Sequence, residues 1–301
     1  MEITLALGGG GSKGFAHIGV LRVLGKEGVR VRAVAGTSMG GLIGSLFAAG
    51  YSPDEMETLM ASLASNPPFD RTRGEGPAMK GLAGISEALT ETLGDRTFQE
   101  LPIPFAVTAV DMETAELLAL RHGLIRDAVL ATIAVPGIFP VMKRNGRSLV
   151  DGSVLDPVPV ALARCLAADL PVVAVTLSPP VDSWVRRPTP RVLGSLPFLG
   201  KYLERSRWAQ ALNIFLGALD ISGALISDLR LTQDRPDAIV RPPVHQIGLL
   251  DPVDIHEVAS LGEQGAEEAL PQIRRLERLP DAMTRRFRRW FSAEETSRYG
   301  M

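Results

Sequence analysis

A serine flanked by glycines stands where an apolar segment gives way to a run of small residues, at GTSMG, residues 36–40. The apolar segment at 29–35 is expected to be a strand, and residues 39–49 have the spacing of a helix. G-x-S-x-G between a strand and a helix is typical of a nucleophile elbow, a tight turn that exposes the serine hydroxyl. Gly36 and Gly40 would give Ser38 the room for that turn. The alternative is a plain glycine-rich turn in which the serine is incidental.

Strands and helices are expected to alternate along the rest of the chain. The apolar runs predicted as strands are 3–7, 29–35, 105–110, 149–150, 172–177 and 238–241. The helical patterns are 16–27, 39–49, a segment opened by the capping box at 52–55, 123–132, 158–168, 201–231 and 254–270. This alternation predicts an α/β fold, a three-layer α/β/α sandwich with a mostly parallel central sheet.

The amino-acid composition argues against several classes of protein. The 301 residues are 46% apolar and 22% charged, which predicts a large core, and the net charge of −2 argues against a nucleic-acid binder. A single cysteine, Cys165, excludes an internal disulfide and fits a reducing compartment. The N-terminus lacks the basic region of a signal peptide, and the apolar stretch 211–226 is interrupted by Asp220. We therefore expect a cytoplasmic protein without a membrane span.

The glycine-rich run GGGGSKG, residues 8–14, lies between the first predicted strand and the first predicted helix. Its glycines Gly9, Gly11 and Gly14 satisfy G-x-G-x-x-G, but a dinucleotide site also expects an acidic residue after the second strand, where the serine turn stands instead. A P-loop would need Ser or Thr after Lys13, and Gly14 stands there. The run therefore favours another use of converging backbone N–H groups, an oxyanion hole for acyl transfer.

A candidate base for the serine follows the predicted strand at 149–150, in Asp151-Gly152-Ser153. Asp and Gly are also common turn residues, so a plain turn is the alternative for this tripeptide. A carboxylate is a weak base at its ordinary pKa of about 3.9. It can serve only where water is partly excluded and the hydroxyl lies at hydrogen-bonding distance.

The histidines offer a second candidate base. In α/β-hydrolases the triad order is Ser, then Asp or Glu, then His, which leaves His245 and His256 after Asp151. Neither lies in a glycine-marked loop at a strand end, and His17 falls in the first predicted helix, where a packed or capping role is expected. A Ser38–Asp151 pair is therefore favoured, and a triad is the alternative.

Taken together, these motifs resemble the opening of a bacterial patatin-like phospholipase. The similarity extends over LALGGGGSKGFAHIGVLRVLGKEGVRVRAVAGTSMGGLIGSLFAAGYS, PFAVTAVDMETAELLALRHG and AVPGIFPVMKRNGRSLVDGSVLDPVPV, and more weakly over DAIVRP. The resemblance implies an α/β sandwich with Ser38 as nucleophile and Asp151 as general base. It also implies an oxyanion hole at Gly9, Gly10 and Gly11, with Lys13, Gly14 and Gly152 supporting a head group or these loops.

The sequence departs from the usual pattern of the family at three points. Lys13 stands where arginine is commoner, Ser153 replaces Gly or Ala, and Asp156-Pro157 replaces a frequent Asn-Asn. None of these changes removes a reacting group. Asp156 does place a second carboxylate near the expected site, where it would alter the electrostatics.

The resemblance also implies a function and a domain arrangement. It predicts hydrolysis of phospholipids, lysophospholipids or related acyl esters without metal or cofactor. A catalytic domain is expected at 1–273, with a lid or interfacial segment at 179–230, and a basic tail at 274–301 that could lie on a membrane surface. For the segment around 184–215 and for the tail, the alternatives are helices packed against the core or in solvent. An acyltransferase, or a non-catalytic lipid-binding or regulatory protein, is the alternative function.

Overall fold

The computed structural model describes residues 1–65, 78–180, 207–277 and 299. The strands are β1 Glu2–Leu7, β2 Arg30–Gly36, β3 Phe105–Asp111, β4 Glu116–Leu120, β5 Met142–Arg144, β6 Arg147–Asp151, β7 Val172–Val175 and β8 Ala238–Val240. The helices are α1 Ala16–Lys26, α2 Met39–Ala48, α3 Pro53–Ser65, α4 Ala83–Leu93, α5 Ile125–Thr132, α6 Val160–Leu166, α8 Arg207–Asp234 and α9 Ile255–Arg275. Short 3₁₀ turns lie at η1 Gly11–Phe15, η2 Phe98–Glu100 and η3 Gly152–Val154.

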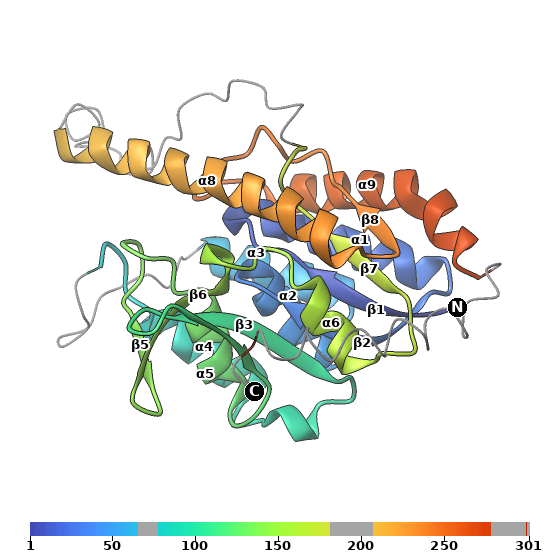
Figure 1. Cartoon of the computed structure of the whole chain (residues 1–301), viewed down its shortest axis with the longest axis horizontal. Helices are drawn as coiled ribbons and strands as arrows, with labels where there is room; N and C mark the ends of the chain where they lie inside the picture. Colours follow the sequence, from blue (N-terminus) through green and yellow to red (C-terminus); the bar gives the residue numbers. More distant parts are fainter. Residues whose placement is uncertain (66–77, 181–206, 278–298, 300–301) are drawn as a thin grey trace.

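An eight-stranded sheet forms the centre of the molecule, with helices on both faces (Figure 1). The strand order is β5-β6-β3-β2-β1-β7-β8, and β4 also pairs with β3. From β3 to β8 the neighbouring strands run parallel, whereas β4, β5 and β6 join by antiparallel pairing. The fold is therefore the three-layer α/β/α sandwich, with the mostly parallel sheet, that the sequence predicts.

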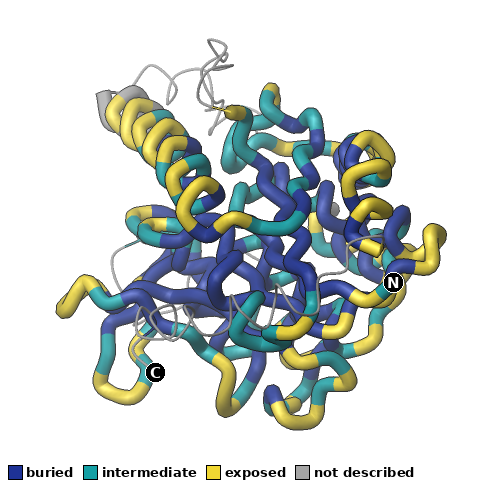
Figure 2. The backbone as a smooth tube through the Cα atoms, turned by 45° about the vertical axis from the view of Figure 1, so that its right-hand side comes forward, coloured by how far each residue is buried: buried dark blue, intermediate teal, exposed yellow. Residues whose placement is uncertain are grey.

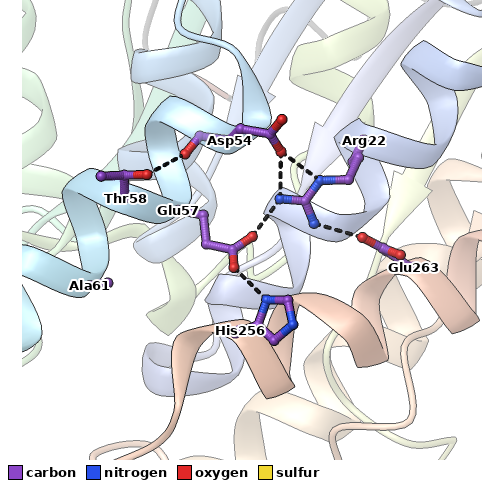
Figure 3. A pocket seen from close by; sticks show the side chains of 7 residues that line it. All are labelled: Arg22, Asp54, Glu57, Thr58, Ala61, His256 and Glu263. Atoms are coloured by element: carbon purple, nitrogen blue, oxygen red, sulfur yellow. Dashed lines mark hydrogen bonds and ion pairs between the residues drawn. The ribbon is translucent and has the colours of Figure 1, made fainter.

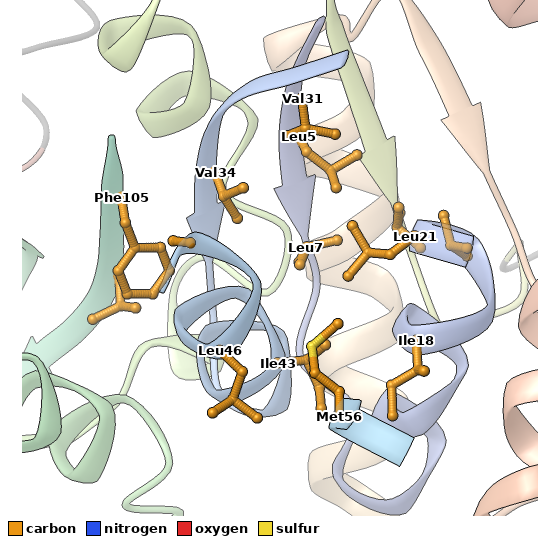
Figure 4. Close-up of a cluster of buried hydrophobic side chains, with 14 of the residues drawn as sticks. Leu5, Leu7, Ile18, Leu21, Val31, Val34, Ile43, Leu46, Met56 and Phe105 are labelled. Carbon is orange, nitrogen blue, oxygen red and sulfur yellow. The ribbon is translucent and has the colours of Figure 1, made fainter. Parts of the chain in front are cut away.

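The two faces of the sheet carry side chains of different size, because successive residues of a strand point to opposite faces. On β1, Leu5 and Leu7 join the larger core cluster, which also contains buried residues of α1, α2, α3 and α9 (Figure 4). Ala6 lies in the other cluster together with Ala35 and Ala106 of the neighbouring strands. These small residues leave room for α6 to pack closely on that face. Figure 2 shows the sheet almost wholly buried between the two layers.

Helices α1 and α9, far apart in the sequence, cross with their backbones in contact. A Cβ atom added at Gly19 of α1 would lie 1.8 Å from the carbonyl oxygen of Ala259, and one added at Gly262 of α9 would lie 1.9 Å from that of Ala16. Because real Cβ atoms do not approach so closely, only glycine fits at these two positions. The crossing fixes α9 against the N-terminal part of the fold.

Several elements differ from the sequence-based expectation. Helix α4 and strands β4 and β5 were not predicted, and α9 continues past Pro271 to Arg275. A proline removes one helical hydrogen bond, but Ile273 and Leu276 beyond it are buried in the larger core cluster, and this packing holds the last turn.

Parts of the predicted lid segment and of the basic tail lie outside the described residues. The proposed lid falls partly on 181–206, and most of the tail falls on 278–298. In the part of the chain that is described, 207–234 is one long helix, and Tyr299 is buried. No helix among the described residues is long and apolar enough to cross a membrane.

Candidate active site

Ser38 occupies a strained turn between β2 and α2. Its backbone has φ 54° and ψ −125°, a left-handed conformation that is uncommon for residues other than glycine. A Cβ atom at Gly40 would lie 2.2 Å from the carbonyl oxygen of Leu7, and one at Gly36 would lie 2.5 Å from the carbonyl oxygen of Gly40. The Ser38 N–H donates to Thr132 Oγ1 at 2.9 Å. The glycines thus let strand and helix meet closely, and the threonine holds the turn, as a nucleophile elbow requires.

Asp151 stands at the end of β6 and contacts the serine directly. Ser38 Oγ donates to Asp151 Oδ2 at 2.5 Å, although the two residues are 113 positions apart in the sequence. Antiparallel pairing places β6 beside β3, which in turn pairs with β2. Ser38 is 6% exposed and Asp151 is 2% exposed, so water is largely excluded from this contact. No imidazole lies between the two side chains.

Ser153, one of the departures from the family pattern, holds the other carboxylate oxygen of Asp151. Asp151 Oδ1 accepts hydrogen bonds from the Ser153 backbone N–H at 2.7 Å and from the Ser153 hydroxyl. Burial raises the pKa of Asp151 to about 6, while hydrogen bonds from Ser153 and Ser38 act in the opposite direction. The carboxylate is therefore a stronger base than an exposed aspartate and is still ionised at pH 7.

The glycine loop lies against this pair. A Cβ atom at Gly9 would lie 3.1 Å from Ser38 Cβ and 2.8 Å from Ser153 Oγ, so the loop backbone is next to both side chains. The Gly9 N–H donates to the Pro157 carbonyl at 2.9 Å and is therefore already engaged. Gly10 and Gly11 stand at the start of η1, where the first N–H groups of a helix have no acceptor within the helix. Of the three predicted oxyanion donors, Gly10 and Gly11 therefore fit that role. Gly9, which has no side chain, lets the loop lie close to Ser38 and Ser153.

Interactions from several elements brace the loop. His17 Nε2 lies 2.7 Å from the Gly8 carbonyl oxygen, and burial lowers the pKa of His17 to about 4, against the opposing effect of this hydrogen bond. The neutral imidazole therefore donates to Gly8. The Ser12 N–H donates to the Leu249 carbonyl at 3.0 Å. His17 is thus a packed residue, as its position in the sequence suggested, but its partner could be found only from the structure.

The predicted support residues contact these same loops. Lys13 is buried, and its Nζ lies 2.8 Å from Asp220 Oδ1 on α8, so its charge is paired within the protein. A Cβ atom at Gly14 would meet Met39 Cγ at 2.1 Å, next to the elbow. One at Gly152 would meet Thr108 Oγ1 at 2.1 Å. These positions fit support of the loops, and the paired ammonium of Lys13 is less suited to a head group.

The two other candidate histidines lie elsewhere: His245 is half-buried in the turn that follows β8, and His256 lies in a separate cleft. His256 Nδ1 is 2.7 Å from Glu57 Oε1, in a cleft of about 630 Å³ between α1, α3 and α9 (Figure 3). Arg22 also lines this cleft and forms ion pairs with Glu57 and two further carboxylates. Neither member of the Ser38–Asp151 pair lines it. The cleft is therefore a network of ion pairs that joins three helices, separate from the candidate site.

A known protein family matches the region of the chain that contains all three motifs. The family model described as patatin-like phospholipase matches residues 5–164, more than half of the chain. The chain belongs to the patatin-like phospholipase family. The matched residues contain the glycine loop, the elbow and Asp151. Membership of this family supports lipid acyl hydrolysis as the class of activity.

Relatives of this chain occur in bacteria and animals. An uncharacterized NTE family protein of Mycobacterium tuberculosis is 34% identical over 180 residues, which are 59% of this chain and 49% of that protein. Patatin-like phospholipase domain-containing protein 6 of Mus musculus is 29% identical over 174 residues, 55% of this chain and 13% of that protein. The chain thus spans about half the length of the mycobacterial relative, and much less of the mouse protein.

A solved structure shares the architecture. The crystal structure of VipD from Legionella pneumophila matches with a TM-score of 0.54, covering 90% of this chain and 66% of that chain at 13% identity. At this identity the likeness shows the fold alone.

Proposed function

We propose that this protein is a serine hydrolase that cleaves carboxylic esters of phospholipids, lysophospholipids or related lipids through a Ser38–Asp151 dyad. The observation that carries the proposal is the 2.5 Å contact between Ser38 Oγ and Asp151 Oδ2 at a strained elbow. Burial of both residues supports it, because a carboxylate with a raised pKa can accept the serine proton.

The first half of the reaction forms an acyl-enzyme. Asp151 takes the proton of Ser38 as the serine oxygen attacks the ester carbonyl carbon. The N–H groups of Gly10 and Gly11 stabilise the negative charge on the carbonyl oxygen, a contribution that is typically worth about 10²–10³ in rate for each donor. The ester bond then breaks, and the proton held by Asp151 passes to the departing alcohol oxygen.

The second half returns the enzyme to its starting state. Asp151 takes a proton from water, and the hydroxide that forms attacks the acyl carbon. The bond to Ser38 Oγ breaks, the serine recovers the proton from Asp151, and the fatty acid leaves. Ser153 holds the carboxylate in place through Oδ1 in both halves, which leaves Oδ2 facing the serine.

Labelling with a fluorophosphonate probe tests the proposal. The wild-type protein is expected to form a covalent adduct at Ser38, Ser38→Ala to form none, and Asp151→Asn to react at least about a hundredfold more slowly. His256→Gln is the matched control, because this side chain lies in the separate ion-pair cleft. A folded wild-type protein that resists the probe would favour the non-catalytic alternative. Adding alcohol acceptors during ester turnover separates a hydrolase, which releases fatty acid, from an acyltransferase, which forms new esters.

Contact with a lipid surface forms part of the same proposal, and helix α8 supports it. Four large apolar residues are between 49% and 73% exposed at a spacing that repeats on one side of this helix, namely Ile214, Ile221, Leu225 and Leu229. The inner side of the helix contacts the site, since Asp220 pairs with Lys13 of the glycine loop. Figure 2 shows the exposed outer side of α8 along much of its length.

Vesicle sedimentation tests this contact. The double variant Ile221→Glu/Leu225→Glu is expected to bind vesicles of phosphatidylcholine and phosphatidylglycerol at least about fivefold more weakly than wild type, because apolar area would be lost and charge added. The control Ser62→Glu/Ala64→Glu adds the same charge on exposed positions of α3. Equal binding by both variants and wild type would contradict a role for α8, whereas labelling by the probe would continue to report on the dyad.

A further inference from the structure

Tyr299 lies far along the sequence from the candidate site but is buried in the core beside it. Its side chain is 1% exposed and belongs to the core cluster on the alanine-rich face of the sheet. That cluster includes Ala6 of β1 and Val158 and Leu162 near the start of α6. The aromatic ring therefore packs under the segment that connects Asp151 to α6.

The phenol hydroxyl makes two hydrogen bonds in this segment. It donates to Asp156 Oδ2 at 2.9 Å and accepts from the Leu162 N–H at 3.0 Å. Asp156 is also buried, and a buried carboxylate is costly unless it accepts hydrogen bonds. Tyr299 supplies one to this carboxylate, which stands where the family frequently has asparagine.

The dipeptide Asp156-Pro157 in turn contacts both parts of the candidate site. The Thr37 hydroxyl donates to the Asp156 carbonyl at 2.9 Å, and Thr37 directly precedes the nucleophile. The Gly9 N–H donates to the Pro157 carbonyl at 2.9 Å. One dipeptide thus hydrogen-bonds to both the residue before the serine and the glycine loop, in addition to the direct bond from the Thr37 N–H to the Leu7 carbonyl at 3.0 Å.

We propose that Tyr299 is a positioning residue for the reaction: by holding the Asp156 carboxylate it fixes the Asp156-Pro157 dipeptide, and through it the spacing between Ser38 and the glycine loop. This inference rests on the proposed hydrolase function. A small shift of the loop relative to the serine would weaken stabilisation of the oxyanion, because that stabilisation depends on preset geometry. It would have little effect on binding of the acyl chain.

Tyr299→Phe tests the inference with little change to packing, because it removes the hydroxyl and keeps the ring. The rate constant for fluorophosphonate labelling and kcat for a soluble ester are both expected to fall about tenfold, with KM within about twofold of wild type. Tyr51→Phe is the matched control: the Tyr51 hydroxyl also makes a long-range hydrogen bond, to the Thr92 carbonyl at 2.8 Å, away from the dyad. Its rates should stay within about twofold of wild type.

A double variant shows whether the hydroxyl acts through Asp156. In an Asp156→Ala background, adding Tyr299→Phe should change the labelling rate by less than about twofold, since the shared interaction is already lost. Wild-type kinetics in Tyr299→Phe, a lower melting temperature with unchanged kcat, or multiplicative effects in the double variant would each overturn the inference. Failure of the wild-type protein to label would instead count against the proposed function itself.

Discussion

The pH dependence expected for ester hydrolysis by the proposed Ser38–Asp151 dyad follows from the environment of Asp151. The base must be ionised to accept the Ser38 proton, and burial raises the pKa of Asp151 to about 6. The fraction of ionised Asp151 should then be about one tenth at pH 5 and about nine tenths at pH 7. We therefore expect kcat/KM to fall about tenfold between pH 7 and pH 5, with the midpoint near 6.

Replacing Ser153 should shift the midpoint of this pH profile. Its hydroxyl and its backbone N–H both donate to Asp151 Oδ1, and these hydrogen bonds favour the charged carboxylate. Ser153→Ala removes the hydroxyl and keeps the N–H, so the pKa of Asp151 should rise further. The acid side of the profile should move to higher pH, while the rate on the alkaline plateau changes much less.

The assay is fatty-acid release from a soluble short-chain ester between pH 4.5 and 8.5, with circular dichroism at each pH to confirm that the protein stays folded. His245→Gln and His256→Gln serve as controls. A midpoint near 4, or an unmoved midpoint in Ser153→Ala, would refute the argument from burial. Loss of the acid transition in either histidine variant would show that an imidazole, and not Asp151, is the base.

Three further predictions concern stability and are measured by urea unfolding. Asp151→Asn should raise the free energy of unfolding at pH 8 by up to about 3 kcal/mol while lowering activity at least about a hundredfold. The reason is that the raised pKa of Asp151 makes the native state lose stability as pH rises from about 4 to about 6. The gain should therefore vanish below pH 4. Gly262→Ala should cost more than about 3 kcal/mol, since the added methyl would lie 1.9 Å from the Ala16 carbonyl oxygen; Gly25→Ala, with open space around it, should cost little. Lys13→Met should cost about 2 kcal/mol by leaving Asp220 without this buried partner, and a milder loss in Lys13→Arg would support the charge pair as the cause.

The sequence predicted those features that depend on local pattern. The strand–turn–helix order around Ser38 and the capping box of Ser52 and Glu55 are visible in a few adjacent residues, and the structure contains both. The sandwich follows from the alternation of apolar runs and helical patterns. Ser38 and Asp151 are in direct contact, whereas their roles as nucleophile and base stay a prediction.

The features that escaped prediction depend on distant contacts. Thr132 accepts from the Ser38 N–H across 94 positions, and no local pattern marks an ordinary threonine in a helix for such a role. The hydrogen bond from the Gly9 N–H to the Pro157 carbonyl is likewise a contact that only the packed loops disclose, and the oxyanion hole stays a prediction. The extension of α9 past Pro271 depends on the burial of Ile273, which a propensity rule does not register.

The separation of Ser38 from Asp151 in the sequence has a consequence for biosynthesis. The elbow and the glycine loop emerge from the ribosome early, but the carboxylate arrives only with β6, which must then pair with β3. Under the proposed mechanism, a nascent chain that ends before this strand carries the nucleophile without its base and is expected to be inactive towards esters. The proposed activity would therefore arise only after β6 has paired with β3 and much of the sheet has assembled.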